Sequence, residues 1–183
     1  MLKNIKAGAL LTNKISESSV LNNVDLGEDV TIWHFCNLYG CRIGDHTQIG
    51  SYCEIQSHVS IGTYCRLQAR VFIPEQVKIG DYVFIGPSVT FTNDKHPTVP
   101  KTIMRTWKCE KTEVGAYTSL GANAVIGPGV TIGSGAVVGS GSCVMANVSP
   151  FSIVVGNPAR KIADIRDEKY REHYLEVIKA LQS

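Results

Sequence analysis

The sequence has no long hydrophobic run and little net charge, and each absence excludes a class of protein. No apolar stretch approaches the ~18 residues that a membrane-spanning helix requires. The 18 basic and 16 acidic residues leave a formal charge of +2, which is too small to favour a nucleic acid or a membrane surface as a partner. The start of the chain, Met1 to Leu11, has no small-residue cleavage site after its short apolar run, so we expect no signal peptide and a cytoplasmic protein.

The strongest feature that is present is a six-residue repeat of aliphatic side chains. The first series comprises Ile43, Ile49, Ile55, Ile61, Leu67, Ile73, Ile79 and Ile85, continued by Phe91, and the second comprises Val114, Leu120, Ile126, Ile132, Val138 and Val144. Leu26, Ile32 and Leu38 belong to the same pattern, with one residue missing before Ile43. Neither a helix, with apolar residues every three or four positions, nor a lone strand, with strict alternation, has this period.

A six-residue period predicts short flat strands separated by corners. Three such sides form a triangular coil of 18 residues, so that residues 18 apart, such as Ile43, Ile61 and Ile79, stack inside it at a spacing of about 4.8 Å. Cys41 and Cys53 are 12 residues apart, as are Cys53 and Cys65, which places the three on different sides of the coil. We expect them to be packed, reduced thiols. The sequence contains no Cys-x-x-Cys pair, which is the usual signature of a zinc site.

The repeat has one long interruption: Val114 follows Phe91 by 114 − 91 = 23 positions, where one repeat would need six. Long loops inside compact repeats are usually functional or disordered. A regular prism has no cleft of its own, so we expect this loop, 92–113, to supply the reactive chemistry. Its chemistry-bearing side chains include Asn93, Asp94, His96, Arg105 and Trp107.

The repeat ends after residue 156, and the last stretch has helical spacing. From Arg166 to Gln182, apolar residues at positions 170, 174, 178 and 181 fit one helix face. Such a helix would cap the open end of the coil stack, which otherwise exposes unpaired strand edges. We therefore predict an N-terminal segment at 1–19, a β-helix at 20–156 that contains the loop, and a tail with a capping helix at 157–183.

Four segments carry a resemblance to a known family. They are Trp33-His34-Phe35 and residues 86–97 (GPSVTFTNDKHP), 120–129 (LGANAVIGPG) and 155–162 (VGNPARKI). They resemble the hexapeptide-repeat acyltransferases, and more narrowly the N-acetyltransferases of amino-deoxysugars carried on dTDP or UDP. The resemblance implies an all-β fold, a left-handed parallel β-helix with an extended loop and a C-terminal α-helix. The left hand comes from the resemblance alone, because parallel crossovers are generally right-handed.

The same resemblance implies the cosubstrate, the assembly and a biosynthetic role. It implies a homotrimer with acetyl-CoA lying along the coils between two subunits, in the synthesis of sugars for lipopolysaccharide or other surface polysaccharides. By this resemblance Gly121, Ala122 and Gly139 contact the pantetheine, and Arg160 and Lys161 meet the CoA phosphates. Two fixed cations also suit a polyanionic ligand on physical grounds, although a solvated basic pair at a domain end would look the same.

Acyl transfer to an amine requires a neutral nitrogen that is held against a thioester and then loses a proton. His96 is the only histidine in the loop, and histidine titrates near neutral pH. We therefore expect Asn93 to orient the amine and His96, with Asp94, to accept its proton. Related enzymes leave a second mechanism open, in which His96 only binds substrate and the departing CoA sulfur takes the proton.

The remaining candidate substrate contacts are Trp33, His34, His58, Arg105 and Trp107. The two histidines could equally be ordinary corner residues of the repeat. If His34 matters, the Trp33-His34-Phe35 run could face the nucleotide sugar from a neighbouring subunit.

Three other functions compete with this hypothesis. The main alternative is a hexapeptide O-acetyltransferase that acts on a sugar or serine hydroxyl, since His96-Pro97 is similar to the His-Pro of the galactoside and maltose acetyltransferases. A metal hydratase of the carbonic-anhydrase type needs three converging histidines, whereas His34, His46 and His58 fall on successive different sides, so we expect no metal. A pure scaffold or an ice-binding β-helix would need neither the loop nor residues 155–162.

Overall fold

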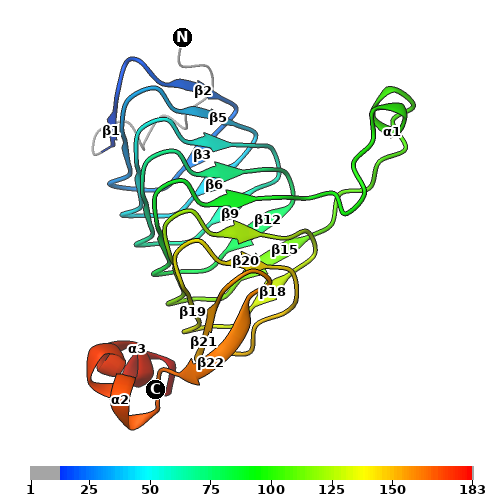
Figure 1. Cartoon of the computed structure of the whole chain (residues 1–183). Helices are drawn as coiled ribbons and strands as arrows, with labels where there is room; N and C mark the ends of the chain where they lie inside the picture. Colours follow the sequence, from blue (N-terminus) through cyan, green and yellow to red (C-terminus); the bar gives the residue numbers. More distant parts are fainter. Residues whose placement is uncertain (1–12, 183) are drawn as a thin grey trace.

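The computed structural model describes residues 13–182. The chain is wound into about eight turns of short strands that form three sheets, parallel throughout except for the last strand of the first sheet (Figure 1). This confirms the predicted left-handed parallel β-helix with a projecting loop and a C-terminal helix. The expectations for residues 1–12, including that of no signal peptide, lie outside the described residues. Within residues 13–182, no helix has both the length and the apolar character needed to cross a membrane.

Each side of the triangular coil contributes one strand to one of the three sheets. The first sheet has the spatial order β1 (Lys14–Ile15), β4 (Thr31–Ile32), β7 (Gln48–Ile49), β10 (Arg66–Leu67), β13 (Phe84–Ile85), β16 (Ser119–Leu120), β19 (Val137–Val138), β21 (Ser152–Val155) and β22 (Arg160–Asp164). The second contains β2 (Val20–Asn22), β5 (Asn37–Tyr39), β8 (Glu54–Ile55), β11 (Phe72–Ile73), β14 (Thr90–Phe91), β17 (Val125–Ile126) and β20 (Cys143–Val144). The third contains β3 (Asp25–Leu26), β6 (Arg42–Ile43), β9 (Ser60–Ile61), β12 (Val77–Ile79), β15 (Thr112–Val114) and β18 (Thr131–Ile132).

The predicted column of stacked aliphatic residues is present. Ile43 pairs with Ile61, and Ile61 lies opposite Ile79 on the next strand. All three are at most 3% exposed. Because each coil buries the same position as the coil above it, the interior is one continuous apolar column.

The first coils are one residue shorter than the later ones, and the repeat begins earlier than predicted. Leu26 pairs with Ile43, a step of 43 − 26 = 17 residues, whereas Ile43 pairs with Ile61, a step of 61 − 43 = 18. Ile15 already pairs with Ile32 through β1 and β4. The boundary predicted at residue 20 is therefore too late. A search in strict steps of six residues missed the first strands, because a shorter step between two buried residues shifts the positions of all the buried residues before it.

The inward-facing cysteines are buried free thiols, as predicted. Cys41, Cys53 and Cys65 precede β6, β8 and β10, which belong to three different sheets. The Sγ atoms of Cys53 and Cys65 donate to carbonyl oxygens one coil further on, at 3.2 and 3.1 Å. Burial raises the pKa of Cys41 to about 12 and that of Cys65 to about 11, so these thiols remain protonated at neutral pH.

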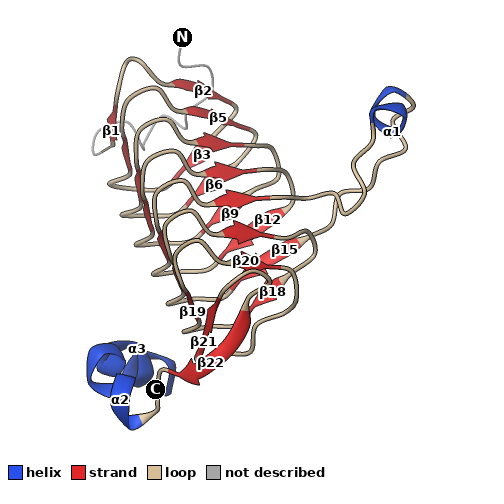
Figure 2. Ribbon diagram, in the orientation of Figure 1, coloured by secondary structure: helices blue, strands red, loops and turns tan. Residues whose placement is uncertain are grey.

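The C-terminal segment adds a hairpin before it becomes helical. β22 pairs antiparallel with β21, so a strand occupies part of the tail predicted at 157–183. Two short helices follow, α2 (Glu168–Arg171) and α3 (Leu175–Gln182), joined by a 3-10 turn, where the sequence predicted a single helix (Figure 2). Ile178 of α3 is buried against Ile153 and Ile165, which anchors the helices to the last strands.

We predict that Ile73→Ala lowers the free energy of unfolding by about 2–5 kcal/mol, because it leaves a cavity in a fully buried column. Urea unfolding followed by circular dichroism measures the change. Val20→Ala is the control, because the side chain of Val20 on strand β2 is 62% exposed and its loss should change stability by less than about 0.5 kcal/mol. Equal destabilisation by the two variants would contradict the stacked interior.

Candidate functional site

Residues 92–111 leave the coil as a projecting segment, which we call the arm. It connects β14 to β15 and stands away from the side of the β-helix (Figure 1). Its one helix, α1 (Val99–Ile103), has no buried residue. The predicted loop, 92–113, is thus present, except that its last two residues already belong to β15.

The two ends of the arm are joined at its root. The backbone N–H of Glu110 donates to the carbonyl of Asn93 at 2.8 Å, and Lys95 Nζ lies 3.9 Å from Glu110 Oε2. Cys109 Sγ donates to the carbonyl of Glu75, on the preceding corner, at 3.3 Å. These contacts fix where the arm leaves the prism.

The backbone at His96 is held from two directions. Its N–H donates to Asp94 Oδ1 at 2.8 Å, and its carbonyl accepts from Lys101 Nζ at 2.8 Å. The imidazole itself is exposed and has no hydrogen-bond partner among residues 13–182. The structure therefore brings the three predicted catalytic residues, Asn93, Asp94 and His96, into one short ordered segment with a free imidazole.

Charged side chains of both signs lie at the arm. Burial raises the pKa of the Cys109 thiol, and the negative charges of Glu75, Glu110 and Asp94 act in the same direction, whereas a hydrogen bond with Asn93 opposes them. Lys95 is paired with Glu110, and residues 92–111 carry five basic and two acidic side chains.

Arg105 and Trp107 lie on the outer part of the arm. Arg105 has a positive φ of 53°, and no described contact joins either side chain to another predicted site residue. The arm also exposes large apolar side chains, namely Val99, Ile103, Met104 and Trp107. Within one chain, this surface has no described partner.

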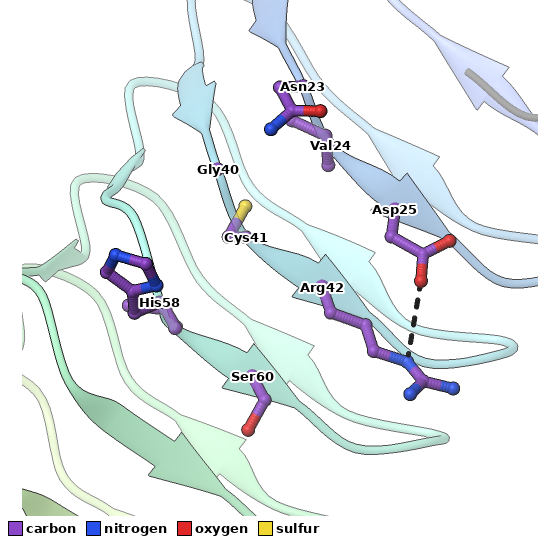
Figure 3. Close-up of a pocket in the computed structure, with 9 residues that line it drawn as sticks. Asn23, Val24, Asp25, Gly40, Cys41, Arg42, His58 and Ser60 are labelled. Carbon is purple, nitrogen blue, oxygen red and sulfur yellow. Dashed lines mark ion pairs between the residues drawn. The ribbon is translucent and has the colours of Figure 1, made fainter. Parts of the chain in front are cut away.

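His58 lies beside a surface hollow of about 640 Å³ (Figure 3). The hollow is lined by Asn23, Val24, Asp25, Gly40, Cys41, Arg42, His58, Val59 and Ser60, which come from β3, β6, β9 and the corners before these strands. Sequence reasoning selected His58 but missed Arg42 and Asn23. The signal that could have found them is the residue missing from the repeat just before Ile43.

Trp33 and His34 lie elsewhere, at the corner after β4. His34 Nδ1 is 2.6 Å from Ser16 Oγ, and Trp33 is 51% exposed beside a second hollow of about 450 Å³. This corner follows a strand of the first sheet, whereas the arm follows a strand of the second. A single chain therefore does not bring the predicted substrate contacts together.

The five predicted cofactor contacts lie along the last strands of the first sheet. Gly121 follows β16, Gly139 follows β19, and Arg160 and Lys161 belong to β22, in the spatial order of the sheet. Ala122 begins the adjoining corner. The N–H of Gly139 donates to the carbonyl of Val154 at 2.8 Å, which links these strands directly.

The two cations differ in their surroundings. Lys161 Nζ is paired with Asp164 Oδ2 at 3.4 Å, whereas Arg160 Nη1 donates to the carbonyl of Ala159. Both cations line a hollow of about 240 Å³ that also contains Ser152. The buried Ser152 Oγ has no hydrogen-bond partner in the described chain. This oxygen is enclosed by the chain, whereas the exposed cation of Arg160 can be reached by an external group.

The histidines considered for metal binding do not converge. His34, His46 and His58 follow strands of different sheets. In the part of the chain that the structure describes, no group of three or more His, Cys, Asp or Glu side chains could hold a metal ion.

The sequence matches one family model twice, and the two matches flank the arm. Residues 40–75 and 111–146 match the bacterial transferase hexapeptide model, which describes six repeats. No curated protein sequence matches the chain significantly.

One similar solved structure is a mutant of the N-acyltransferase AntD from Bacillus cereus in complex with dTDP and coenzyme A. Its sequence is 25% identical to this chain, the TM-score is 0.59, and the match covers 92% of this chain and 89% of that one. Galactoside acetyltransferase in complex with coenzyme A is 26% identical with a TM-score of 0.50, over 83% and 67%. The GDP-perosamine N-acetyltransferase of Caulobacter crescentus, with CoA and GDP-perosamine bound, is 23% identical with a TM-score of 0.53, over 84% of this chain. This chain spans only 58% of that enzyme's length, and this likeness supports the fold alone.

We predict that Glu75→Gln speeds the reaction of Cys109 with a thiol reagent at pH 8. Removing one negative charge lowers the raised pKa of the thiol, so more thiolate is present at that pH. The measurement is the reaction rate with Ellman's reagent across pH in a Cys143→Ser background, where the other four cysteines are buried. Glu54→Gln is the matched control, because Glu54 is not among the charges acting on Cys109. Identical pH profiles for the two variants would show that Glu75 does not act on the arm root.

Proposed function

We propose that this chain, whose coils match the hexapeptide model of bacterial transferases on both sides of the arm, is an acyl-CoA-dependent N-acyltransferase. Its acceptor is the amino group of a nucleotide-linked amino-deoxysugar, and acetyl-CoA is the donor. The resemblance of the repeats to hexapeptide-repeat acyltransferases is confirmed by the family match. AntD, which was solved with dTDP and coenzyme A, is similar over nearly the whole of both chains and supports the choice of acceptor.

The observation that carries the proposal is the projecting arm, which brings Asn93, Asp94 and His96 into one short segment with an exposed imidazole. The similarity to the N-acyltransferase AntD, over 92% of this chain and 89% of that one, supports an amine as the acceptor.

The last strands of the first sheet are the surface that we assign to coenzyme A. The exposed Arg160 guanidinium lines a hollow there and can donate to phosphate oxygens. Gly121 and Gly139 follow strands of the same sheet, so in this proposal the pantetheine chain lies beside these corners.

The reaction forms one bond and breaks one. The acceptor reacts as the neutral amine, so an ammonium form first gives one proton to the solvent. The lone pair of the amine attacks the thioester carbonyl carbon, the C–N bond forms, and the C–S bond then breaks with departure of the CoA sulfur. The nitrogen loses a second proton in this sequence, which in this proposal His96 accepts and passes to the departing sulfur. Asp94 fixes the backbone of His96, and we assign Asn93 to orienting the sugar.

A homotrimer with sites between subunits completes the proposal. In one chain Trp33 and His34 lie at a different corner from the arm, so a substrate touching both sets must lie between two copies. The exposed apolar side chains of the arm, at 63–76% for Val99, Ile103 and Met104, also favour cover by a neighbouring molecule.

The substrates also indicate where the proposed reaction takes place. Nucleotide sugars and acetyl-CoA are cytoplasmic metabolites, so we propose that the reaction takes place in the cytoplasm. It would serve the synthesis of surface-polysaccharide sugars such as those of lipopolysaccharide.

The second candidate is an O-acetyltransferase. Galactoside acetyltransferase is similar at 26% identity, and the His96-Pro97 pair also allows this reading. The choice of acceptor separates the two functions.

We predict that the protein transfers acetyl groups from acetyl-CoA to dTDP- or UDP-linked 3-amino or 4-amino deoxysugars but not to the matching sugars with a hydroxyl at that carbon. His96→Ala should lower kcat by about 10²–10⁴-fold if His96 takes the proton. Asn93→Ala should raise KM for the amine. Steady-state release of CoA measures both effects.

His173→Ala is the control for this experiment, because His173 is an exposed histidine in the C-terminal helical segment. Near-normal turnover by His96→Ala would remove His96 as the base. Transfer to the hydroxyl sugars alone would replace the proposed function with the second candidate.

We also predict that Arg160→Gln raises KM for acetyl-CoA by about tenfold, because a charge-assisted hydrogen bond to phosphate is worth about 1.5–3 kcal/mol. The effect should vanish with acetyl-pantetheine, which lacks the nucleotide and its phosphates. Arg171→Gln, at another exposed cation, is the control. An equal loss with both donors would contradict the assignment of Arg160 to the phosphates.

A further inference from the structure

We propose that Lys101 is a positioning residue for His96, the residue to which the proposed function assigns the proton of the amine. This inference rests on the proposed function and deepens it, because it names the side chain that holds the reactive segment of the arm in place. Lys101 acts through the backbone of His96.

The outer part of the arm has no apolar interior that could hold it. All residues from 95 to 108 except Lys101 are exposed, and α1 has no buried residue. Figure 1 shows α1 at the outer end of the arm, away from the coils. Helices shorter than about 12 residues are marginal in water without tertiary support, and α1 has five residues. The local structure around His96 therefore depends on a few polar contacts.

Lys101 supplies one of these contacts. It is the one partly buried residue between residues 95 and 108. Its Nζ donates to the carbonyl of His96 at 2.8 Å. Within residues 13–182, this is the one hydrogen bond that joins α1 to the segment 93–97. The lysine side chain is thus used inside the arm, where it ties α1 to the segment that bears His96.

This contact completes a hold on His96 from both sides. The N–H of His96 donates to Asp94 Oδ1 at 2.8 Å, and its carbonyl accepts from Lys101. The N–H and the carbonyl belong to the two peptide groups on either side of the His96 Cα. Because a residue has only two soft backbone torsions, fixing both peptide groups limits the direction of the Cα–Cβ bond. The hold therefore limits where the imidazole can reach.

The contacts at the arm root do not replace that of Lys101. The N–H of Glu110 holds the carbonyl of Asn93, and Lys95 pairs with Glu110, so these contacts fix the start of the arm. Lys101 acts further out, and its own carbonyl accepts from the N–H of Thr106 at 2.9 Å. His96 is thereby linked through Lys101 to the half of the arm that returns to the coil.

The position of the imidazole matters for the proposed reaction. A general base must lie within hydrogen-bond reach of the nitrogen whose proton it accepts. An imidazole that is restricted before substrate binds spends more time in reach, which raises the rate of the chemical step. Lys101 belongs to the arm, whereas the residues assigned to coenzyme A follow strands of the first sheet or belong to them. Loss of Lys101 should therefore affect kcat and leave KM for acetyl-CoA unchanged.

Steady-state kinetics of Lys101→Met test the inference, because methionine keeps an unbranched side chain and removes the ammonium group. We expect kcat for acylation of the amino sugar to fall about 3–10-fold, the effect of one lost hydrogen bond. Lys101→Arg should restore most of the activity, since a guanidinium can also donate to the carbonyl. Lys108→Met is the matched control, because it removes the same charge from an exposed position of the same arm.

A double-mutant cycle separates positioning of His96 from a general effect on the arm. In a His96→Ala background, Lys101→Met should cause no further loss of kcat, because the imidazole that it positions is absent. An equal loss of kcat in both backgrounds would overturn the inference. Near-normal turnover by His96→Ala would overturn it too, together with the role of His96, while acylation of the amine would stand.

Hydrogen–deuterium exchange at the His96 amide distinguishes failure of this inference from failure of the proposed function, because it requires no activity. We expect Lys101→Met to speed exchange at this amide, whereas Lys108→Met should exchange like wild type. If wild type acylates an amine and Lys101→Met matches it in both kcat and exchange, the inference fails and the function stands. If Lys101→Met speeds exchange while wild type acylates no amine, the hold of Lys101 on His96 stands and the function fails.

Discussion

The whole molecule depends on the parallel hydrogen bonding of one coil to the next at a fixed register. The N–H of Arg42 donates to Val59 and that of Gly44 to Ile61, at 2.9 and 2.8 Å, and the same pattern recurs along the chain. This register places each aliphatic residue above its counterpart, so hydrogen bonding and apolar burial support one another. A slip of one residue would reverse which side chains face inward. The strict six-residue spacing of aliphatic residues in the sequence results from this fixed register.

The same regularity determines where function can arise. Regular coils bury their aliphatic residues and offer only short flat faces outside, so recognition requires a departure from the repeat. Three departures within residues 13–182 carry candidate contacts. The arm replaces a corner after β14, the five-residue step before Ile43 opens a hollow, and the β21–β22 hairpin ends the first sheet with two cations. The candidate ligand contacts of the arm, the hollow and the hairpin therefore lie where the repeat is irregular.

The sequence predicted the parts of the structure that repeat and only some of the parts that do not. The stacking of Ile43 on Ile61 follows directly from spacing, and the arm follows from the break in that spacing. β22 was missed because an antiparallel strand after the last coil has no repeat to reveal it. The hollow beside Arg42 and Asn23 was missed because it depends on what a shortened corner leaves uncovered, which is visible only in three dimensions. The gathering of Asn93, Asp94 and His96 could be anticipated because they are neighbours in sequence.

The separation of the predicted contacts in one chain is itself an argument about assembly. The first sheet carries both the Trp33 corner and the residues assigned to coenzyme A, whereas the arm leaves the second sheet after β14. The faces of a triangular prism point in different directions, so one chain does not present both sets to a single ligand. In the proposed homotrimer the first sheet of one copy lies against the arm of its neighbour, and neither coil has to change for this. The exposed apolar side chains of the arm would then be covered, which is why we assign the acceptor to a site shared by two copies.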